Sequence, residues 1–173
     1  AATTRQTLRR VPRLAERLAP AVPQPDLRTD VRYDAAGPYL DYADWPLITD
    51  DPNIQTDAQG VPLVRSPDRR AQYNPVTIAQ LGLELDARAK MSDDSAAANQ
   101  AMTLARFLAA SQRRSTGVWE YAFAFDVVGT DRRLTPPWAS AMAQGQAVSL
   151  LTRAHAREPR DEFLEAIVRA LRP

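Results

Sequence analysis

Hydrophobic residues in the second half of the chain recur three and four positions apart, with polar residues between them. This spacing lines one face of an α-helix, whereas alternate hydrophobic residues line one face of a strand. The helical spacing predicts four helices, at about residues 76–90, 95–112, 137–156 and 160–171. Because the links within each pair are short and the link between the pairs is long, we expect two helical hairpins, 76–112 and 137–171.

Local signals support the predicted helix starts. Asn74–Pro75 combines a side-chain N-cap with a proline at the first helical position. Ser92–Asp94 supplies capping oxygens and negative charge at the positive end of the second helix. Thr135–Pro136 and Pro159 are typical of residues that precede a helix, and they begin the third and fourth predicted helices.

The link between the hairpins has an aromatic residue at every second position: Trp119, Tyr121, Phe123 and Phe125. An extended strand would place all four rings on one face. We therefore expect a short, aromatic, β-like connection here. Its rings are suited either to stacking on sugars or to filling a core.

The first 72 residues have a different pattern. Residues 5–19 place leucines and a valine at helical spacing between arginines, which predicts a short amphipathic helix. Residues 20–72 are rich in proline and poor in periodicity, which is typical of a long irregular segment with short strands as an option. We therefore divide the chain into an N-terminal part, 1–72, and a helical part, 73–173.

The composition excludes several classes of site. With 45% hydrophobic and 25% charged residues among 173, the chain has the composition of an ordinary globular domain. Its net charge of +1 gives no indication of a nucleic-acid partner. The absence of cysteine and the single histidine, His155, argue against thiolate or histidine-rich metal sites. No apolar run approaches the roughly 20 residues that span a bilayer, and the small residues of Ala1–Thr4 leave open whether the protein is exported.

The most unusual helical stretch is 137–149, where Gln144, Gly145 and Gln146 stand at positions that usually favour Leu or Ala. Glycine costs about 1 kcal/mol relative to alanine inside a helix, and a buried glutamine needs hydrogen-bond partners. The two glutamines point about 200° apart around the helix axis, so they lie on different faces. One face is unusually polar and comprises Met142, Gln146, Ser149 and Arg153. We predict that Gln146 and Arg153 face a cleft, that Gln144 takes part in ordinary packing, and that Gly145 marks a close helix contact.

Three segments share residues, order and spacing with one enzyme family. The first combines Gly60–Leu63 with Tyr73–Leu83, which reads YNPVTIAQLGL; the second is Leu104–Trp119; the third is Pro137–Ala154, which contains WASAMAQGQAVS. Together, over roughly residues 60–156, they resemble the C-terminal α/α domain of the D-glucuronyl C5-epimerases, which act on heparosan-type polysaccharides.

The resemblance implies a mainly α-helical fold, a partial α/α toroid in which one ring of helical hairpins lines the centre. A four-helix bundle is the alternative. The toroid is partial because four helices do not close such a ring, and because the family's tyrosine and acidic catalytic groups lie beyond the part that corresponds to Pro173. We therefore expect the helix at 160–171 to expose apolar surface, and a second polypeptide or self-association to cover it.

The activity implied by the resemblance is epimerisation at C5 of glucuronic acid within a polysaccharide. A proton α to a carboxylate is removed from one face and another is returned to the opposite face. Such a site needs two acid/base groups, donors for the carboxylate and aromatic walls for the sugar rings, and it requires neither a metal nor a cofactor. The implied partner is therefore a polysaccharide that contains uronic acid.

The chain offers several side chains for this cleft. Tyr73 is the best catalytic candidate, because it precedes a helix whose positive end would lower the pKa of a phenol. Gln80 is a candidate either for substrate contact or for bracing a loop, and Trp138 would form a cleft wall. The predicted substrate-binding residues are Tyr73, Gln80, Trp119, Tyr121, Trp138, Gln146 and Arg153.

Two other interpretations remain open. The chain fits a non-catalytic carbohydrate-binding or assembly module on the same scaffold. It also fits another α/α-toroid enzyme, a polysaccharide lyase or hydrolase. A hydrolase needs two suitably spaced carboxylates, and Glu120 and Asp126 are the acids beside the aromatic segment.

Overall fold

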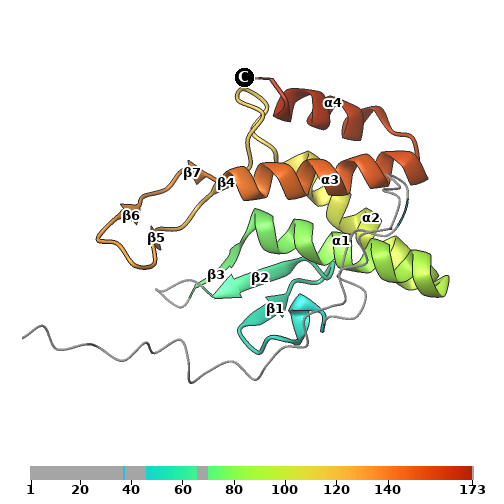
Figure 1. Cartoon of the computed structure of the whole chain (residues 1–173), viewed down its shortest axis with the longest axis horizontal. Coiled ribbons are helices and arrows are strands. Elements are labelled where there is room, and N and C mark those ends of the chain that lie inside the picture. The colour runs from blue at the N-terminus through green and yellow to red at the C-terminus, as the bar shows by residue number, and fades with distance from the viewer. Residues whose placement is uncertain (1–36, 38–45, 66–69, 173) are drawn as a thin grey trace, which may run out of the picture. The chain divides into compact units, whose positions relative to one another are not determined.

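The computed structural model of the protein describes residue 37, residues 46–65 and residues 70–172 (Figure 1). The chain divides into two units, 1–31 and 32–173, and the first lies outside the described residues, as does the predicted helix at 5–19. The elements of the second unit are, in order, η2 (Ile48–Asp50), β1 (Ile54–Thr56), β2 (Pro62–Arg65), β3 (Ala71–Tyr73), α1 (Pro75–Ser92), α2 (Ser95–Ser111), β4 (Glu120–Tyr121), β5 (Phe125–Asp126), β6 (Arg133–Leu134), β7 (Trp138–Ala139), α3 (Ala141–Arg157) and α4 (Asp161–Ala170).

All four predicted helices are present, so the prediction of a mainly helical chain is confirmed. The N-cap prediction is confirmed at α1, where the Asn74 side chain accepts hydrogen bonds from the backbone N–H groups of Val76 and Thr77. It is also confirmed at α2, where the Asp94 side chain accepts hydrogen bonds from the backbone N–H groups of Ala96 and Ala97. None of the helices in the described ranges is long and apolar enough to cross a lipid bilayer.

The third helix begins at Ala141, four residues later than predicted. Ser140 is its N-cap, because the Ser140 hydroxyl accepts a hydrogen bond from the Ala143 N–H at 3.1 Å. Trp138 is therefore not the first helical residue, as the sequence suggested. It lies in β7, which pairs antiparallel with β4.

The helices form two hairpins, α1–α2 and α3–α4, which pack against each other through α1 and α3. Asp93 and Asp94 turn the chain from α1 back along α2, and α1 also packs against α3. Residues 81–87 of α1 are all buried, which is typical of a helix surrounded by protein. His155 of α3 accepts a hydrogen bond from the Arg160 backbone N–H at 3.2 Å, which ties α3 to the start of α4.

The hydrophobic core lies between the helices and takes one buried ring from the long connection. Its largest fully buried side chains are Val61, Pro62, Ile78, Leu83, Leu104, Leu108, Trp119, Leu150, Leu151 and Phe163. Gly82 is the close contact between α1 and α3, because a Cβ atom there would overlap the Leu150 side chain. Gly145, which the sequence predicted for this role, is exposed and has no neighbour within 4 Å of an added Cβ.

The segment before α1 forms a small antiparallel sheet in the order β1-β2-β3, so the short strands that the sequence left as an option are present. The β1–β2 turn is held by Asp57, whose Oδ1 accepts from the backbone N–H groups of Gln59 and Val61 at 2.8 and 2.9 Å. Gly60 completes the turn with a φ of +76°, a conformation that side chains disfavour. Gln100 of α2 donates to the Gln59 and Gly60 carbonyls, so the turn is fixed against the helices.

The connection between the hairpins is a two-stranded ribbon, 120–139, that extends away from the helices (Figure 1). β4 pairs with β7 and β5 pairs with β6, both antiparallel. The predicted single aromatic strand is therefore only partly right, since residues 122–124 interrupt it.

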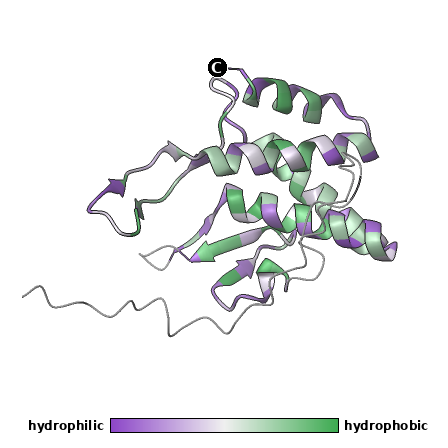
Figure 2. Ribbon diagram, in the orientation of Figure 1, coloured by the Kyte–Doolittle hydropathy of each residue, from purple (hydrophilic) through white to green (hydrophobic). Residues whose placement is uncertain are grey.

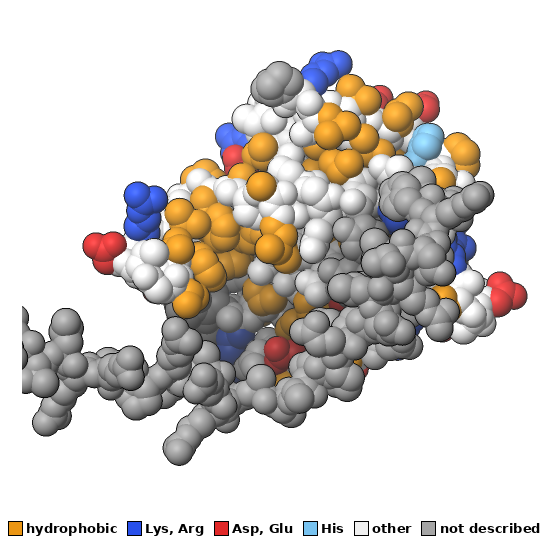
Figure 3. Space-filling view, in the orientation of Figure 1, with side chains coloured by type: hydrophobic (Ala, Val, Ile, Leu, Met, Phe, Trp, Pro, Cys, Tyr) orange, Lys and Arg blue, Asp and Glu red, His pale blue; other side chains and the backbone are white. Residues whose placement is uncertain are grey.

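The prediction that the last helix exposes apolar surface is confirmed. α4 carries hydrophobic and hydrophilic residues side by side (Figure 2). Its Leu164 and Val168 are 48% and 41% exposed, and Leu171, which follows the helix, is 68% exposed. Hydrophobic side chains gather over this helix in the space-filling view (Figure 3). The expectation that a second polypeptide or copy covers this face stays a prediction.

Replacing Gly82 by alanine is expected to lower the free energy of unfolding by about 1–3 kcal/mol, because the added methyl group overlaps Leu150 in a packed core. Gly145→Ala is the matched control. It adds the same methyl group to an exposed helix position and is expected to stabilise the protein by about 1 kcal/mol through helix propensity. Chemical denaturation measures both changes, and equal effects would contradict the packing argument.

Candidate functional site

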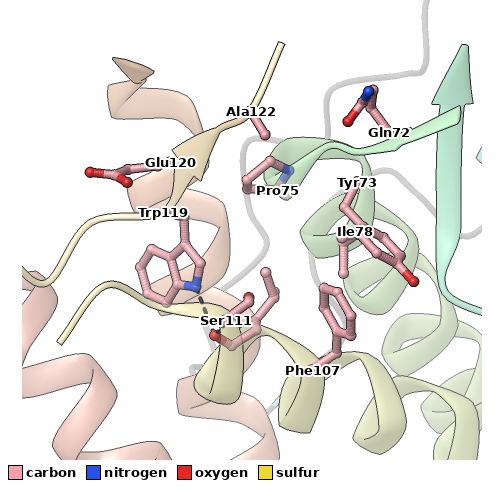
Figure 4. A pocket seen from close by; sticks show the side chains of 10 residues that line it. Gln72, Tyr73, Pro75, Ile78, Phe107, Ser111, Trp119, Glu120 and Ala122 are labelled. Atoms are coloured by element: carbon pink, nitrogen blue, oxygen red, sulfur yellow. Dashed lines mark hydrogen bonds between the residues drawn. The ribbon is translucent and has the colours of Figure 1, made fainter. Parts of the chain in front are cut away.

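A pocket of about 220 Å³ opens where β3 enters α1, next to the end of α2 and to β4 (Figure 4). Its lining combines aliphatic and aromatic side chains with a few polar groups: Gln72, Tyr73, Pro75, Ile78, Phe107, Leu108, Ser111, Trp119, Glu120 and Ala122. A mostly apolar pocket with a few polar groups is the usual form of a small-ligand site. Of the predicted substrate-binding residues, Tyr73 and Trp119 line this pocket.

Tyr73 and Glu120 carry two of the polar groups of the lining, and Gln72 and Ser111 carry the others. The Tyr73 hydroxyl and the Glu120 carboxylate point away from each other, with Ile78 and Phe107 between them (Figure 4). The lining is therefore mainly apolar, with polar side chains at several points.

Tyr73 is 42% exposed, and its ring packs on Phe107 with centroids 4.8 Å apart. Its hydroxyl donates to Asp57 Oδ2 at 2.9 Å. This bond raises the pKa of Tyr73, because the neighbouring carboxylate favours the protonated phenol. The sequence predicted the opposite direction from the helix dipole, and that prediction is wrong because the partner in hydrogen-bond contact outweighs the helix end.

Asp57 is held as an anion. The Val61 backbone N–H is the largest cause of its lowered pKa, and Tyr73 and the Gln59 N–H act in the same direction. Sequence reasoning missed Asp57. The signal for it was the Asp57-to-Gly60 spacing between two short strands, which is typical of a tight turn with an Asp that caps its own backbone.

Glu120 of the pocket lining forms an ion pair with Arg113, which lies outside the lining. Arg113 Nη1 lies 2.8 Å from Glu120 Oε2, and the two side chains are 54% and 28% exposed. Arg113 lies two residues after the end of α2, and Glu120 belongs to β4. Sequence reasoning considered Glu120 only as a hydrolase acid and missed Arg113, because the pair forms across a loop. Asp126, the other acid of that hypothesis, pairs with Arg133 on the ribbon.

Trp119 belongs to the core more than to the pocket surface. It is 1% exposed, and its indole N–H donates to the Leu108 carbonyl at 2.8 Å (Figure 4). The ring closes one wall of the pocket, but it offers almost no surface for stacking on a sugar. Between the two uses of the aromatic segment that the sequence left open, this position serves packing.

Tyr121 and Trp138 form an aromatic cluster at the base of the ribbon. Their rings stack 3.8 Å apart with an interplanar angle of 6°, and Phe123 and Phe125 pack against Trp138. The Trp138 indole N–H donates to the Phe123 carbonyl at 2.6 Å. Burial raises the pKa of Tyr121, and its hydrogen bonds with Ser140 and the Val76 backbone oppose this effect. The cluster lies outside the pocket lining, and its exposed ring is Phe125.

Gln144 has a larger structural role than the sequence predicted. Its amide nitrogen donates to the Gly117 carbonyl at 3.1 Å, and its amide oxygen accepts from the Trp119 backbone N–H at 3.0 Å. Gln112 donates to the same Gly117 carbonyl and to the Ala166 carbonyl, both at 2.9 Å, and accepts from Arg169. The two glutamines therefore hold the segment 117–119, which leads to β4, against α2, α3 and α4.

Gln146 and Arg153 do not line the pocket. Gln146 is half-buried, and its Oε1 is buried without a hydrogen-bond partner. Arg153 is buried between α1 and α3, with its Nε 3.8 Å from Asp86 Oδ2. Lys90 and Arg157 share the same carboxylate at 2.8 and 3.5 Å.

Gln80 also lies outside the pocket lining, on the side of α1 that faces η2. It is hydrogen-bonded to Glu84, which accepts the Ile48 backbone N–H at 3.1 Å. Burial raises the pKa of Glu84, and these hydrogen bonds and Arg88 oppose the rise. Of the two roles predicted for Gln80, this contact matches the bracing of a neighbouring loop. In residues 37, 46–65 and 70–172, no group of three His, Asp or Glu side chains is placed to hold a metal ion.

Comparison with known proteins gives one family match, to the segment that contains β4, the ribbon, α3 and α4. Residues 112–173 match the family model described as the D-glucuronyl C5-epimerase C-terminus. The match confirms the predicted resemblance for the stretch from Gln112 to Trp119 and for the WASAMAQGQAVS stretch, and it does not extend to the predicted first segment at 60–83. The comparisons with curated proteins and with solved structures found no match.

Replacing Gln144 by leucine is expected to lower the free energy of unfolding by about 1–3 kcal/mol, because it leaves the Trp119 N–H and one bond of the Gly117 carbonyl unmade. Gln146→Leu is the matched control two residues away. Its side-chain oxygen is already unpaired, so the loss should be smaller than for Gln144. Denaturant titrations compare them, and a larger loss for Gln146 would refute this assignment.

Glu84→Gln is expected to raise the stability at pH 7 and to reduce its dependence on pH. The folded protein raises the pKa of Glu84 above 4.5, so folding favours the protonated group, and this stabilisation is lost as the pH rises through the folded value. The glutamine keeps a hydrogen-bond acceptor for Ile48 and never ionises. Thermal melts between pH 4 and pH 7 measure how the stability of each variant changes with pH. The exposed Glu165→Gln is the control and should leave it unchanged.

Proposed function

We propose that this chain supplies part of the substrate-binding cleft of a uronate C5-epimerase, because residues 112–173 match the family model described as the D-glucuronyl C5-epimerase C-terminus. The single observation that carries the proposal is that the family segment contributes Trp119, Glu120 and Ala122 to the pocket. In this proposal, the hairpins α1–α2 and α3–α4 are two units of an α/α toroid. The substrate is a heparosan-type polysaccharide.

The proposed binding surface runs from the pocket to the aromatic cluster. The exposed ring of Tyr73 and the partly exposed rings of Phe125 and Trp138 present apolar faces of the kind on which pyranose rings stack. Tyr121 supports Trp138 from behind by stacking. Trp119 serves as the fixed back wall.

Proton transfer is assigned to groups outside the described pocket. The Tyr73 phenol donates to Asp57 and has a raised pKa, so it is a poor base near neutral pH. It remains suited to hydrogen bonding with a sugar hydroxyl. Gln80, Gln146 and Arg153 are proposed to support the helices around the cleft, since each lies outside the pocket lining.

The second candidate function is a non-catalytic carbohydrate-binding module on the same scaffold. A different observation favours it: the described pocket has aromatic walls, and the hydrogen bond to Asp57 raises the pKa of its one phenol, Tyr73. The two functions differ in whether C5 exchanges its proton.

Solvent deuterium incorporation at C5 of heparosan chains tests the proposal. In deuterated water, the proposal predicts C5 exchange by a protein that combines this chain with the proton-transfer groups of the cleft, and weak or no exchange by this chain alone. Mass spectrometry and proton NMR of the recovered sugar locate the label. The control is the same polysaccharide incubated with the heat-denatured protein.

Two outcomes separate the candidates. Binding of heparosan without exchange by either protein would support the carbohydrate-binding module. If neither protein binds heparosan and neither exchanges the C5 proton, both candidate functions are overturned.

A further inference from the structure

The pocket between β3, α1, α2 and β4 is a poor environment for a carboxylate. Of the ten residues that line it, none is basic and one, Glu120, is acidic. The nearest cation to Glu120, Arg113, lies outside the lining and is already paired with it. A carboxylate that entered the pocket would lose its water without gaining a cation, and it would meet the negative charge of Glu120. The uronate ring of the proposed substrate is therefore disfavoured as the occupant.

The size and the apolar lining of the pocket suit a single small group. Its volume is about 220 Å³, below the roughly 300–1,000 Å³ of sites that enclose a drug-sized ligand. Ile78 and Phe107 point into it, and Trp119 closes one wall (Figure 4). Transfer of a methyl group from water to such a hydrocarbon surface is favourable, whereas a hydroxyl group gains nothing from it.

Polar atoms reach the same space at several points. The side-chain amide of Gln72 offers both a donor and an acceptor. The Ser111 hydroxyl donates to the Leu108 carbonyl at 3.3 Å, and its oxygen can still accept. A group that matches this lining is uncharged and combines an apolar end with a donor and an acceptor. The acetamido group of an N-acetylated sugar has this composition, with its methyl, N–H and carbonyl groups.

We propose that the pocket binds the acetamido group of an N-acetylated ring, and that the neighbouring uronate ring lies outside the pocket. In a chain where glucuronate and N-acetylglucosamine alternate, one acetamido group in the pocket fixes the positions of the uronates along the cleft. The pocket is then a specificity site for an N-acetylated neighbour. This inference rests on the proposed function, since it takes a heparosan-type polysaccharide as the ligand.

Isothermal titration calorimetry with three octasaccharides tests the inference. All three alternate glucuronate with glucosamine, and they differ in the group on the glucosamine nitrogen, which is acetyl, formyl or sulfonate. The acetylated form should bind most tightly. The formylated form lacks the methyl group and should bind about fourfold more weakly. The sulfonated form places an anion in the pocket and should bind about tenfold more weakly.

Saturation-transfer NMR with the acetylated octasaccharide locates the contact directly. Saturation of the protein should pass most strongly to the acetyl methyl protons, because that group would lie among Ile78, Phe107 and Leu108. The ring protons of the uronates should receive less. Equal transfer to the two kinds of ring would contradict the proposal.

Ala122→Leu tests the same contact from the side of the protein. Ala122 lines the pocket and is exposed, so a larger side chain there fills the pocket without entering the core. Binding of the acetylated octasaccharide should weaken about fourfold, to the level of the formylated form. Ala96→Leu is the matched control, because it makes the same change at an exposed position of α2 outside the lining. It should bind as the unmodified chain does.

Glu120→Gln tests the exclusion of anions. The glutamine keeps the size of the side chain and removes its charge, so binding of the sulfonated octasaccharide should tighten about threefold. Binding of the acetylated form should change less than twofold. Glu165→Gln removes an exposed acid outside the lining and should change neither. Thermal melts show whether each variant is folded.

The outcomes distinguish this inference from the function on which it rests. If the unmodified chain binds none of the three octasaccharides, the proposed function is overturned and the inference with it. If it binds all three equally, or the sulfonated form most tightly, the inference alone is overturned. The same holds if folded Ala122→Leu keeps the full preference for the acetyl group.

Discussion

The arrangement of the helical part depends on one carbonyl group that accepts two hydrogen bonds. The Gly117 carbonyl receives the side-chain amides of Gln112 and Gln144, which come from the end of α2 and the start of α3. Gln112 also reaches the backbone of α4. Gly117 is required there, because its φ is +69° and a Cβ atom would overlap the Arg169 carbonyl. One buried, fully bonded junction therefore joins both hairpins and the connection between them.

This junction sets the position of the pocket. The chain leaves Gly117 and places Trp119 in the core, where its indole N–H is satisfied by Leu108. Glu120 and the ribbon follow in a fixed direction, so one wall of the pocket and the Tyr121–Trp138 stack are built on the same junction. Buried polar groups rigidify a site when all of them are hydrogen-bonded. The side-chain amides of Gln112 and Gln144 are both hydrogen-bonded here.

The other wall of the pocket has a separate origin. Tyr73 precedes α1 in the small sheet, and Asp57 reaches it from the β1–β2 turn. The two walls are thus positioned by different elements, one before α1 and one after α2, and α1 itself lies in the core between them.

The sequence by itself determined the four helices, the N-caps of α1 and α2 and the likeness of residues 112–173 to the epimerase family, because helical spacing, N-caps and motif order are local properties. It also identified the exposed face of α4. Only the tertiary structure decided which glutamine carries the junction, because Gln144 and Gln146 differ in their distant partners and not in their neighbours along the chain. The tertiary structure also decided that Gly82 and not Gly145 makes the close helix contact. It placed Trp138 in a strand and not in the first turn of the third helix, and it set the direction in which the pKa of Tyr73 is shifted. Each was set by a residue at least 16 positions away, Asp57 in the last case, and local periodicity carries no information about such contacts.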